Sequence, residues 1–192
     1  MKIRMIAALL ASMAAASPVL ADDDMARLQD EARAAVKELS TRLGGEMKKE
    51  MEANGPVATI KVCRDLAPAI ASELSRKSGW RVTRVSQKVR DPLLGMPDAW
   101  EQKVLAEFDK RMEKENPANM EFSEMVSEPQ GKYFRYMKAV PVQGMCLKCH
   151  GTPDEVSQPV KDALAAEFPR DKAQGYTLGQ IRGAVTIKRP MF

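Results

Sequence analysis

The sequence predicts an α+β domain whose strands pair antiparallel around intervening helices. Apolar residues recur at helical spacing near the N-terminus, and later stretches alternate between apolar and polar residues. Helical segments separate these later stretches without the regular strand–helix–strand repeat of a parallel sheet. The chain has 192 residues, which suits a single domain.

Residues 1–21 have the features of an export signal in the expected order. Two basic residues precede a short apolar run, Ile6–Ala16, and a small-residue cleavage site ends at Ala21. The run is too short to span a bilayer, and no later segment is longer or more apolar. We therefore expect cleavage after Ala21, a periplasmic location and one domain, 22–192, without a membrane span. The alternative to an export signal is that residues 1–21 form a buried N-terminal helix.

A long amphipathic helix is predicted from Asp24 to about Ala53, with an interruption or end near Gly44-Gly45. Its apolar residues at helical spacing are Leu28, Ala32, Ala35, Leu39, Leu43 and Met47. After Gly55-Pro56, the segment Val57–Cys63 is compatible with a short helix or with a strand. A further helix is expected from Pro68 to about Lys77, before Gly79.

Alternating residues predict a first strand over Trp80–Val89, with an irregularity near Arg84. A proline-containing loop, Asp91–Pro97, follows it. Asp98 and Glu101 then resemble a capping box at the start of a helix that runs to about Lys114.

The second half of the chain predicts a hairpin, a helix and a last strand. Glu121–Ser127 and Lys132–Val142 alternate on either side of a turn that contains Pro and Gly. Glu155–Phe168 has a helical pattern, and Ile181–Lys188 alternates again as a strand. These strands complete the expected antiparallel sheet.

Charge gives little support to nucleic-acid binding. The chain has 30 Lys and Arg against 26 Asp and Glu, and the two kinds are interspersed. The cysteine count is more informative, because three is an odd number for an exported protein and indicates a thiol engaged otherwise than in a disulfide.

The stretch from Gly144 to Thr152 contains Cys146-x-x-Cys149-His150, and His150 is the only histidine of the chain. This spacing predicts one covalently bound haem c. The two cysteine sulfurs would form thioethers to the haem, and the adjacent histidine would be its proximal axial ligand. Export agrees with this prediction, because such attachment takes place outside the bacterial cytoplasm.

Two other roles for these cysteines fit less well. A thioredoxin-like dithiol normally begins a helix in a βαβ setting, which this sequence lacks. A structural zinc site needs four ligands, and the three cysteines and one histidine are separated by a long stretch of chain.

The second axial ligand remains open on residue chemistry alone. A second histidine is excluded within the chain, which leaves methionine, a thiolate, lysine or an open position. The 13 methionines favour methionine by number. Cys63 is the thiol that the haem motif does not use, although most free cysteines are simply small buried residues.

Three stretches together resemble a known family. They are Ile60–Pro68 around Cys63, the loop from Arg84 to Glu101 with its Asp91-Pro92 and Pro97-Asp98-Ala-Trp-Glu segments, and Ala139–Gly151 with the haem motif. The family is an exported bacterial family of haem c-binding proteins, catalogued as a domain of unknown function. The resemblance covers about Asp24–Arg189 and departs from the family pattern at Asp91, where asparagine is more common.

The resemblance implies a PAS-like antiparallel sheet flanked by helices, with a cyanobacterial c-type haem protein as the structural type case. It also implies His/Cys ligation, with Cys63 as the distal axial ligand opposite His150. Around this haem, Arg84, Lys88 and Arg90 are candidates for charge-assisted contacts with the propionates.

The predicted role is a sensor of redox state or of a diatomic gas such as NO, CO or O2. A sensor without an output domain would pass its signal to a separate periplasmic redox or signalling partner. The alternative is an electron-transfer cytochrome. An enzymatic activity is not expected, because no distal acid–base group is evident for a peroxidase-like reaction.

Overall fold

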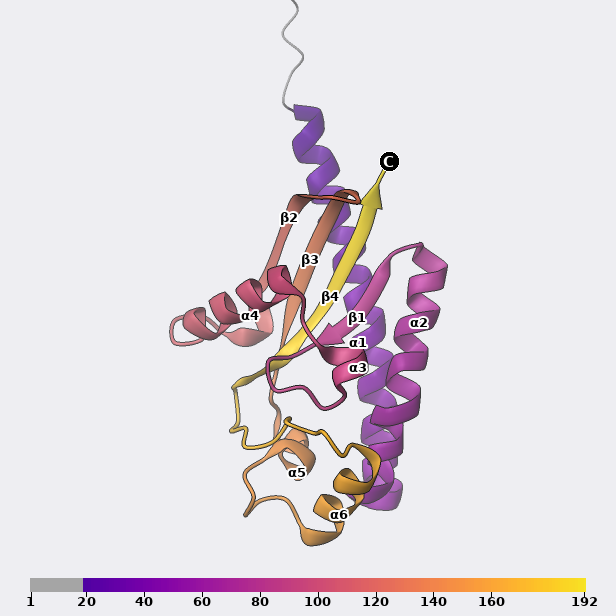
Figure 1. Cartoon of the computed structure of the whole chain (residues 1–192), viewed down its shortest axis with the longest axis vertical. Helices are drawn as coiled ribbons and strands as arrows, with labels where there is room; N and C mark the ends of the chain where they lie inside the picture. The colour runs from indigo at the N-terminus through magenta and orange to yellow at the C-terminus, as the bar shows by residue number, and fades with distance from the viewer. Residues whose placement is uncertain (1–18) are drawn as a thin grey trace, which may run out of the picture.

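A computed structural model describes residues 19–192, so the predicted signal segment lies outside the described residues except for Val19–Ala21. A four-stranded antiparallel sheet in the order β1-β4-β3-β2 is flanked by helices (Figure 1), which confirms the predicted α+β class. The elements are α1 (Val19–Lys61), a π-helical turn (Val62–Leu66), α2 (Ala67–Ser78), β1 (Arg81–Val85), α3 (Pro92–Gly95), α4 (Ala99–Arg111), a 3₁₀ turn (Pro117–Asn119), β2 (Glu121–Glu128), β3 (Gly131–Pro141), a 3₁₀ turn (Gly144–Cys146), α5 (Leu147–His150), α6 (Gln158–Glu167) and β4 (Ile181–Met191).

The N-terminal helix is longer than predicted, and the expected interruption at Gly44-Gly45 is wrong. Helical backbone continues through both glycines and reaches a kink only at Gly55, whose φ is 79°. Leu39 and Leu43 are buried in the core just before the two glycines, so packing outweighs the helix-weakening effect of glycine. The segment after the kink is helical, which excludes the strand alternative for Val57–Cys63.

A π-helical turn over Val62–Leu66 joins α1 to α2. The N–H of Ala67 bonds the carbonyl of Val62, five residues earlier. Pro68 follows at the first turn of α2 and has no N–H to give to a preceding carbonyl, which explains why the helix widens here. α2 then ends at Gly79, in the left-handed conformation with φ 72°, as predicted.

The first strand is shorter than predicted and ends at Val85, which pairs with Ala184 of β4. Beyond it the N–H of Ser86 bonds the carbonyl of Gly95 instead of the sheet. The polypeptide therefore leaves the sheet at Ser86 and enters the loop that holds α3. Asp91 caps α3 by accepting from the N–H of Leu93 at 3.0 Å, a role that asparagine could also fill.

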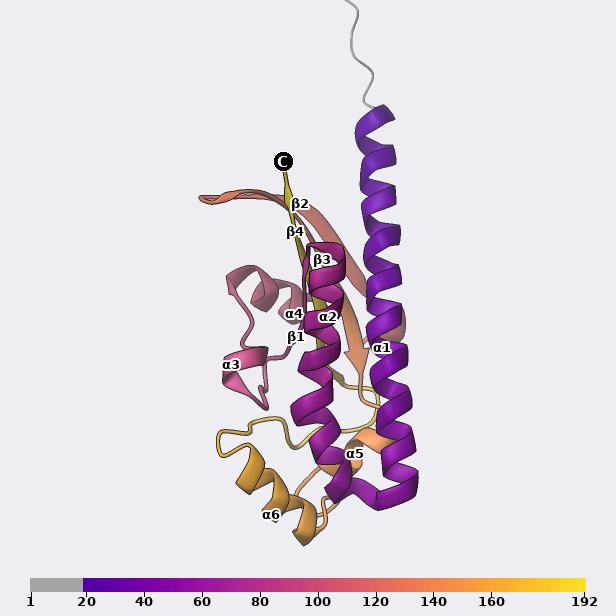
Figure 2. The same cartoon turned by 90° about the vertical axis from the view of Figure 1, so that its right-hand side faces the viewer.

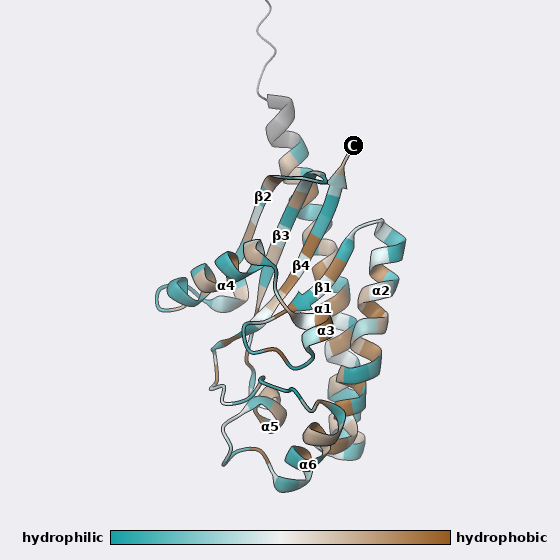
Figure 3. Cartoon of the chain, viewed as in Figure 1, coloured by the Kyte–Doolittle hydropathy of each residue, from teal (hydrophilic) through white to brown (hydrophobic). Residues whose placement is uncertain are grey.

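The sheet separates two apolar cores. Phe134, Tyr136, Val185 and Ile187 pack against α1 and α2 on one face, whereas Met137 and Ala184 pack against α4 on the other. Figure 2 shows α1 and α2 on one side of the sheet and α3 and α4 on the other. Brown and teal segments alternate along α1 and α2 in Figure 3, and their buried apolar residues belong to the same cluster as those of the sheet, as the helical periodicity predicted.

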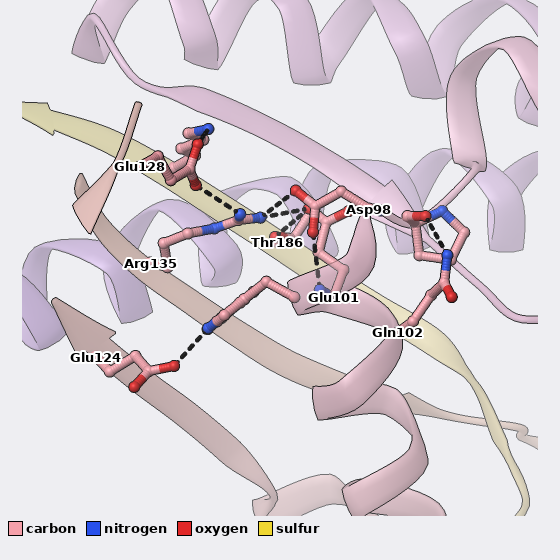
Figure 4. A network of polar contacts seen from close by, with 10 residues as sticks. Asp98, Glu101, Gln102, Glu124, Glu128, Arg135 and Thr186 are labelled. Atoms are coloured by element: carbon pink, nitrogen blue, oxygen red, sulfur yellow. Dashed lines mark hydrogen bonds and ion pairs between the residues drawn. The ribbon is translucent and has the colours of Figure 1, made fainter. Parts of the chain in front are cut away.

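A buried polar network fixes α4 on its side of the sheet (Figure 4). Arg135 of β3 donates to Asp98 at 2.7 Å, to Glu101 at 3.2 Å and to Glu128 at 3.1 Å. Glu101 also accepts from the hydroxyl of Thr186 at 2.9 Å. The predicted capping box is present, since Asp98 and Glu101 exchange hydrogen bonds with each other's N–H groups.

The segment that contains α5 and α6 forms a small lobe beyond the end of the sheet (Figure 1). Its own apolar cluster joins Ile60 of α1 to Val160, Leu164 and Phe168, with Cys149 packed against it. Helix α6 begins at Gln158, later than predicted, because Ser157 is the N-cap residue and Pro159 occupies the first turn. Within 19–192, no helix is long and apolar enough to cross a bilayer.

Candidate functional site

The Cys146–His150 segment forms a 3₁₀ turn that leads into the single helical turn α5. Cys146 and Cys149 are free and partly buried. Gly151 ends this turn by donating its N–H to the carbonyl of Leu147 at 3.0 Å. A Cβ at Gly151 would lie 2.6 Å from the same carbonyl oxygen, so only glycine allows so close a turn. The motif is thus held in a tight local conformation.

His150 is oriented by a backbone carbonyl from a distant segment. Its Nδ1 lies 2.6 Å from the carbonyl oxygen of Ala173, which can only accept a hydrogen bond. Nδ1 therefore carries the proton, and Nε2 keeps its lone pair available for a metal or a donor. Burial, together with the charges of Arg182 and Arg90, holds the pKa of His150 well below its usual value, so the imidazole is neutral.

Cys63 occupies the π-helical turn between α1 and α2 and is partly buried. Its thiol is close enough to Cys149 and to Arg84 to affect the ionisation of both groups. The fold thus brings Cys63 near the haem motif from a position far upstream. Turns of π-helix often occur at functional sites, where they present a side chain outside the normal helical register.

Burial raises the pKa of the Cys149 thiol to about 11, and Cys63 and Cys146 add to this effect. The positive charge of Arg90 opposes it. Before any attachment, Cys149 is consequently a protonated thiol at neutral pH.

Arg90 is buried and is bound to the protein itself. Its Nε donates to Asp171 at 3.1 Å, and its Nη2 donates to the carbonyl of Cys149 at 2.7 Å. The side chains of Arg90 and Asp171 are 9% and 5% exposed, so the ion pair is almost fully desolvated. Arg90 therefore ties the loop after β1 to the haem motif and to the segment before Ala173.

The other two predicted propionate contacts differ from each other. Lys88 lies 4.7 Å from the ring centre of Tyr176 and donates weakly to the carbonyl of Gln174 at 3.3 Å. Arg84, by contrast, has a pKa that is lowered by burial and by the like charge of Arg90, while the nearby Cys63 thiol opposes this effect. Among the described residues it forms no ion pair with a carboxylate.

Arg84 is exposed to solvent near the end of β1, although the protein packed around it lowers its pKa by burial. Arg182 and His150 share this condition, since both are partly exposed while burial is the first cause of their lowered pKa values.

Arg182 is the site residue that the sequence prediction missed. Its Nε lies 3.4 Å from His150 Nε2, and its Nη1 donates to the Ser86 hydroxyl at 2.8 Å. The position of Arg182 depends on the pairing of β3 with β4, which a local sequence pattern does not predict. A separate cavity of about 220 Å³ borders this group at Ser86 and Tyr176 but does not include the cysteines.

Comparison with known proteins places this arrangement in a family. The Tll0287-like family model matches residues 13–190. The chain belongs to the Tll0287-like family. The crystal structure of the cyanobacterial heme-protein Tll0287 superposes with a TM-score of 0.67 at 24% identity, covering 86% of this chain and 96% of that one. No curated protein matches the sequence.

Membership of the Tll0287-like family confirms the resemblance inferred from the three stretches, and the superposition confirms the fold. The ligand roles of Cys63, Cys146, Cys149 and His150 stay predictions. Within the part of the chain that the structure describes, no three His, Cys, Asp or Glu side chains are gathered closely enough to hold a metal ion by themselves.

The residues of this Tll0287-like chain fit a haem in three respects. The two motif thiols are free. The neutral His150 presents Nε2 as an acceptor. The cationic side chains of Arg84, which is exposed, and Arg182, which is partly exposed, suit the two carboxylates of a haem.

Proposed function

We propose that this chain is a periplasmic haem-binding protein that carries one haem c. Cys146 and Cys149 attach the haem, His150 is the proximal ligand and Cys63 is the distal ligand. The similarity to a protein described as a heme-protein supports haem binding, and the motif spacing supports covalent attachment.

The observation that carries the proposal is the hydrogen bond from His150 Nδ1 to Ala173. Metal-binding histidines commonly donate their other ring nitrogen to a carbonyl or carboxylate, which fixes both the tautomer and the ring plane. A histidine that merely filled a core would not need Nε2 directed toward the partly exposed Arg182. The arrangement of His150 therefore supports its role as a metal ligand.

Cys63 is the candidate for the second ligand. It lies in the π-helical turn between α1 and α2, and its thiol acts electrostatically on Cys149 and Arg84. A bound haem would supply one-electron chemistry, and a thiolate ligand would favour its ferric form.

The role supported by this ligand pair is a sensor of redox state or of NO, CO or O2. In this role Cys63 would hold the iron of the oxidised protein, and release of Cys63 after reduction by an external one-electron donor would open a site for a small gas. A periplasmic signalling or redox partner would read the change. A Cys63 that stays bound in both oxidation states would instead make the protein an electron carrier.

Absorption and electron paramagnetic resonance spectra of the purified ferric protein test the ligand assignment. We expect thiolate character in the wild type and its loss in Cys63→Ala. Val62→Ala is the matched control, because it shortens a neighbouring side chain of the same π-helical turn without removing a thiol. A wild-type spectrum without thiolate character, unchanged in Cys63→Ala, would reject Cys63 as the ligand.

Two further measurements separate the remaining parts of the proposal. Mass spectrometry of protein made with the haem c maturation system should show the added mass of one haem, and apoprotein alone would contradict covalent attachment. Carbon monoxide added to the reduced protein should change the haem spectrum. No spectral change would favour the electron carrier over the sensor.

A further inference from the structure

Arg182 occupies an irregularity of the sheet. Val140 pairs with Gly183 and Pro141 pairs with Ile181, so Arg182 is an extra residue opposite the step between Val140 and Pro141. Such bulges redirect a side chain out of the normal alternation of a strand and are frequent beside functional sites. The bulge accounts for the contact between Arg182 and His150.

Glycine at the next position, Gly183, allows β1 to approach the bulged strand closely. Gly183 has a φ of 155°, and a Cβ there would lie 2.3 Å from the carbonyl oxygen of Val85 and 3.0 Å from Ser86. The strands β1 and β4 can approach this closely only without a side chain. Ser86 then donates its hydroxyl hydrogen to the backbone carbonyl of Arg182 at 2.7 Å, which fixes the bulged residue.

The contact of Arg182 with His150 Nε2 is incompatible with metal binding by the same nitrogen. Since Nδ1 carries the proton, Nε2 is an acceptor, and the Nε–H of Arg182 lies 3.4 Å from it. The same lone pair is required for an iron ligand. The guanidinium must therefore leave Nε2 when a metal takes its place.

Arginine charge around His150 exceeds the available carboxylate charge. Arg90 is paired with Asp171 at 3.1 Å. Arg182, by contrast, contacts the neutral His150 and the Ser86 hydroxyl, and within residues 19–192 neither Arg84 nor Arg182 forms an ion pair. Arg84 is exposed and Arg182 is partly exposed, so two carboxylates from a ligand would neutralise them.

We propose that Arg84 and Arg182 bind the two propionates of the haem, and that Arg182 exchanges His150 Nε2 for a propionate oxygen as the haem is loaded. The inference rests on the proposed haem function and extends it. Arg182 is a positioning residue that protects Nε2 before loading and anchors the haem edge afterwards. Each contact replaces an unneutralised charge by a charge-assisted hydrogen bond.

Resonance Raman spectroscopy of the ferric, haem-loaded protein tests this exchange, because the propionate bending bands respond to hydrogen bonds at the carboxylates. We expect Arg182→Gln to shift one band and Arg84→Gln to shift the other, with Arg182→Lys intermediate. Arg170→Gln is the control, since Arg170 is exposed and its loss removes the same charge. The bands of this control should match those of the wild type.

Suppose that the propionate bands are unchanged in both Arg84→Gln and Arg182→Gln, in protein that carries haem by mass. This result would overturn the inference about the arginines but not the proposed haem function. A shift in only one variant removes the other arginine from the inference. If Arg182→Gln does not acquire haem, two other measurements follow the same propionate bands: Arg182→Lys, and the wild type transferred from water to deuterium oxide. Unshifted bands in both would contradict a contact between Arg182 and a propionate. Absence of haem from the wild type would instead contradict the proposed function, and this inference with it.

Discussion

The imidazole of His150 hydrogen-bonds the backbone carbonyl of Ala173 across 2.6 Å, and Asp171 holds that carbonyl in place. One oxygen of Asp171 accepts from the N–H of Ala173 at 2.7 Å, while the other accepts from Arg90 at 3.1 Å. The orientation of His150 therefore depends on a carboxylate that does not touch it, in the manner of the outer contacts that orient metal ligands.

Replacing Asp171 by alanine should destabilise the fold substantially. The substitution leaves the buried Arg90 guanidinium without its carboxylate and frees the N–H of Ala173. Removing one partner of a buried ion pair typically costs about 3–5 kcal/mol. Urea denaturation of wild type and Asp171→Ala, followed by circular dichroism, should show this loss in the free energy of unfolding.

Glu73→Ala is the matched control, because it breaks the ion pair with Arg42 on the protein surface, where both side chains are exposed. Exposed pairs contribute little to stability, so this variant should unfold close to the wild type. Equal stability of Asp171→Ala and Glu73→Ala would show that the Arg90–Asp171 pair does not organise the site.

Local signals in the sequence predicted the parts of the fold that depend on local chemistry. The capping box of Asp98 and Glu101 and the end of α2 at Gly79 each follow from one or two residues and their hydrogen bonds. The helix through Gly44 was not predictable in this way, because burial of Leu43 against distant strands outweighs the local effect of glycine.

The residues of the candidate site also fall into two groups, those indicated by a local motif and those positioned by the tertiary fold. Cys146, Cys149 and His150 form a contiguous motif and were found directly. Arg182 was missed because its position depends on a bulge, and a bulge is a property of the register between two strands. Arg90 was predicted to bind a propionate, yet the tertiary fold gives it a carboxylate partner of its own.

Two glycines of α1 should respond in opposite ways to alanine. Gly44 is exposed, within helical backbone and without neighbours around a Cβ, so Gly44→Ala should stabilise the protein by about 0.5–1 kcal/mol. Gly55 has a φ of 79° and a ψ of −177°, a conformation that essentially only glycine adopts, so Gly55→Ala should destabilise the protein by about 1–3 kcal/mol. Thermal unfolding of both variants tests this. Destabilisation by Gly44→Ala would mean that α1 is interrupted in solution.

The network around Arg135 should make stability depend on acid pH. Hydrogen bonds from Lys188 and then Arg135 hold the pKa of Glu128 below its usual value. Partial burial would raise the pKa of Asp98, but hydrogen bonds from the N–H of Glu101 and from Arg135 outweigh it and lower that pKa. Carboxylates with lowered folded-state pKa values stabilise the fold above their unfolded pKa of about 4 and lose this contribution as pH falls through the folded values.

Arg135→Gln should therefore lose most stability at neutral pH, and its difference from the wild type should narrow below about pH 4. The buried Glu101 would lose its cation, so the neutral-pH cost should be about 3–5 kcal/mol. Urea unfolding at several pH values measures the difference. A gap between the two proteins that stays constant with pH would contradict the assigned role of these carboxylates.

Gly183→Ala tests the geometry on which the position of Arg182 depends. A Cβ at 2.3 Å from the carbonyl oxygen of Val85 cannot be accommodated by moving a flexible side chain, so β1 and β4 must separate. We expect the free energy of unfolding to fall by about 3 kcal/mol or more, and β1, at the edge of the sheet, to separate first.

Gly179→Ala is the control, because Gly179 has a positive φ of 83° but no atom near a Cβ. This substitution should lower the free energy of unfolding by only about 1–2 kcal/mol. Hydrogen exchange should show faster exchange along β1 in Gly183→Ala alone, since a strand that has lost its close partner opens more often. Similar stability and similar exchange in the two variants would show that the bulge forms without glycine, and that another feature directs Arg182 to His150.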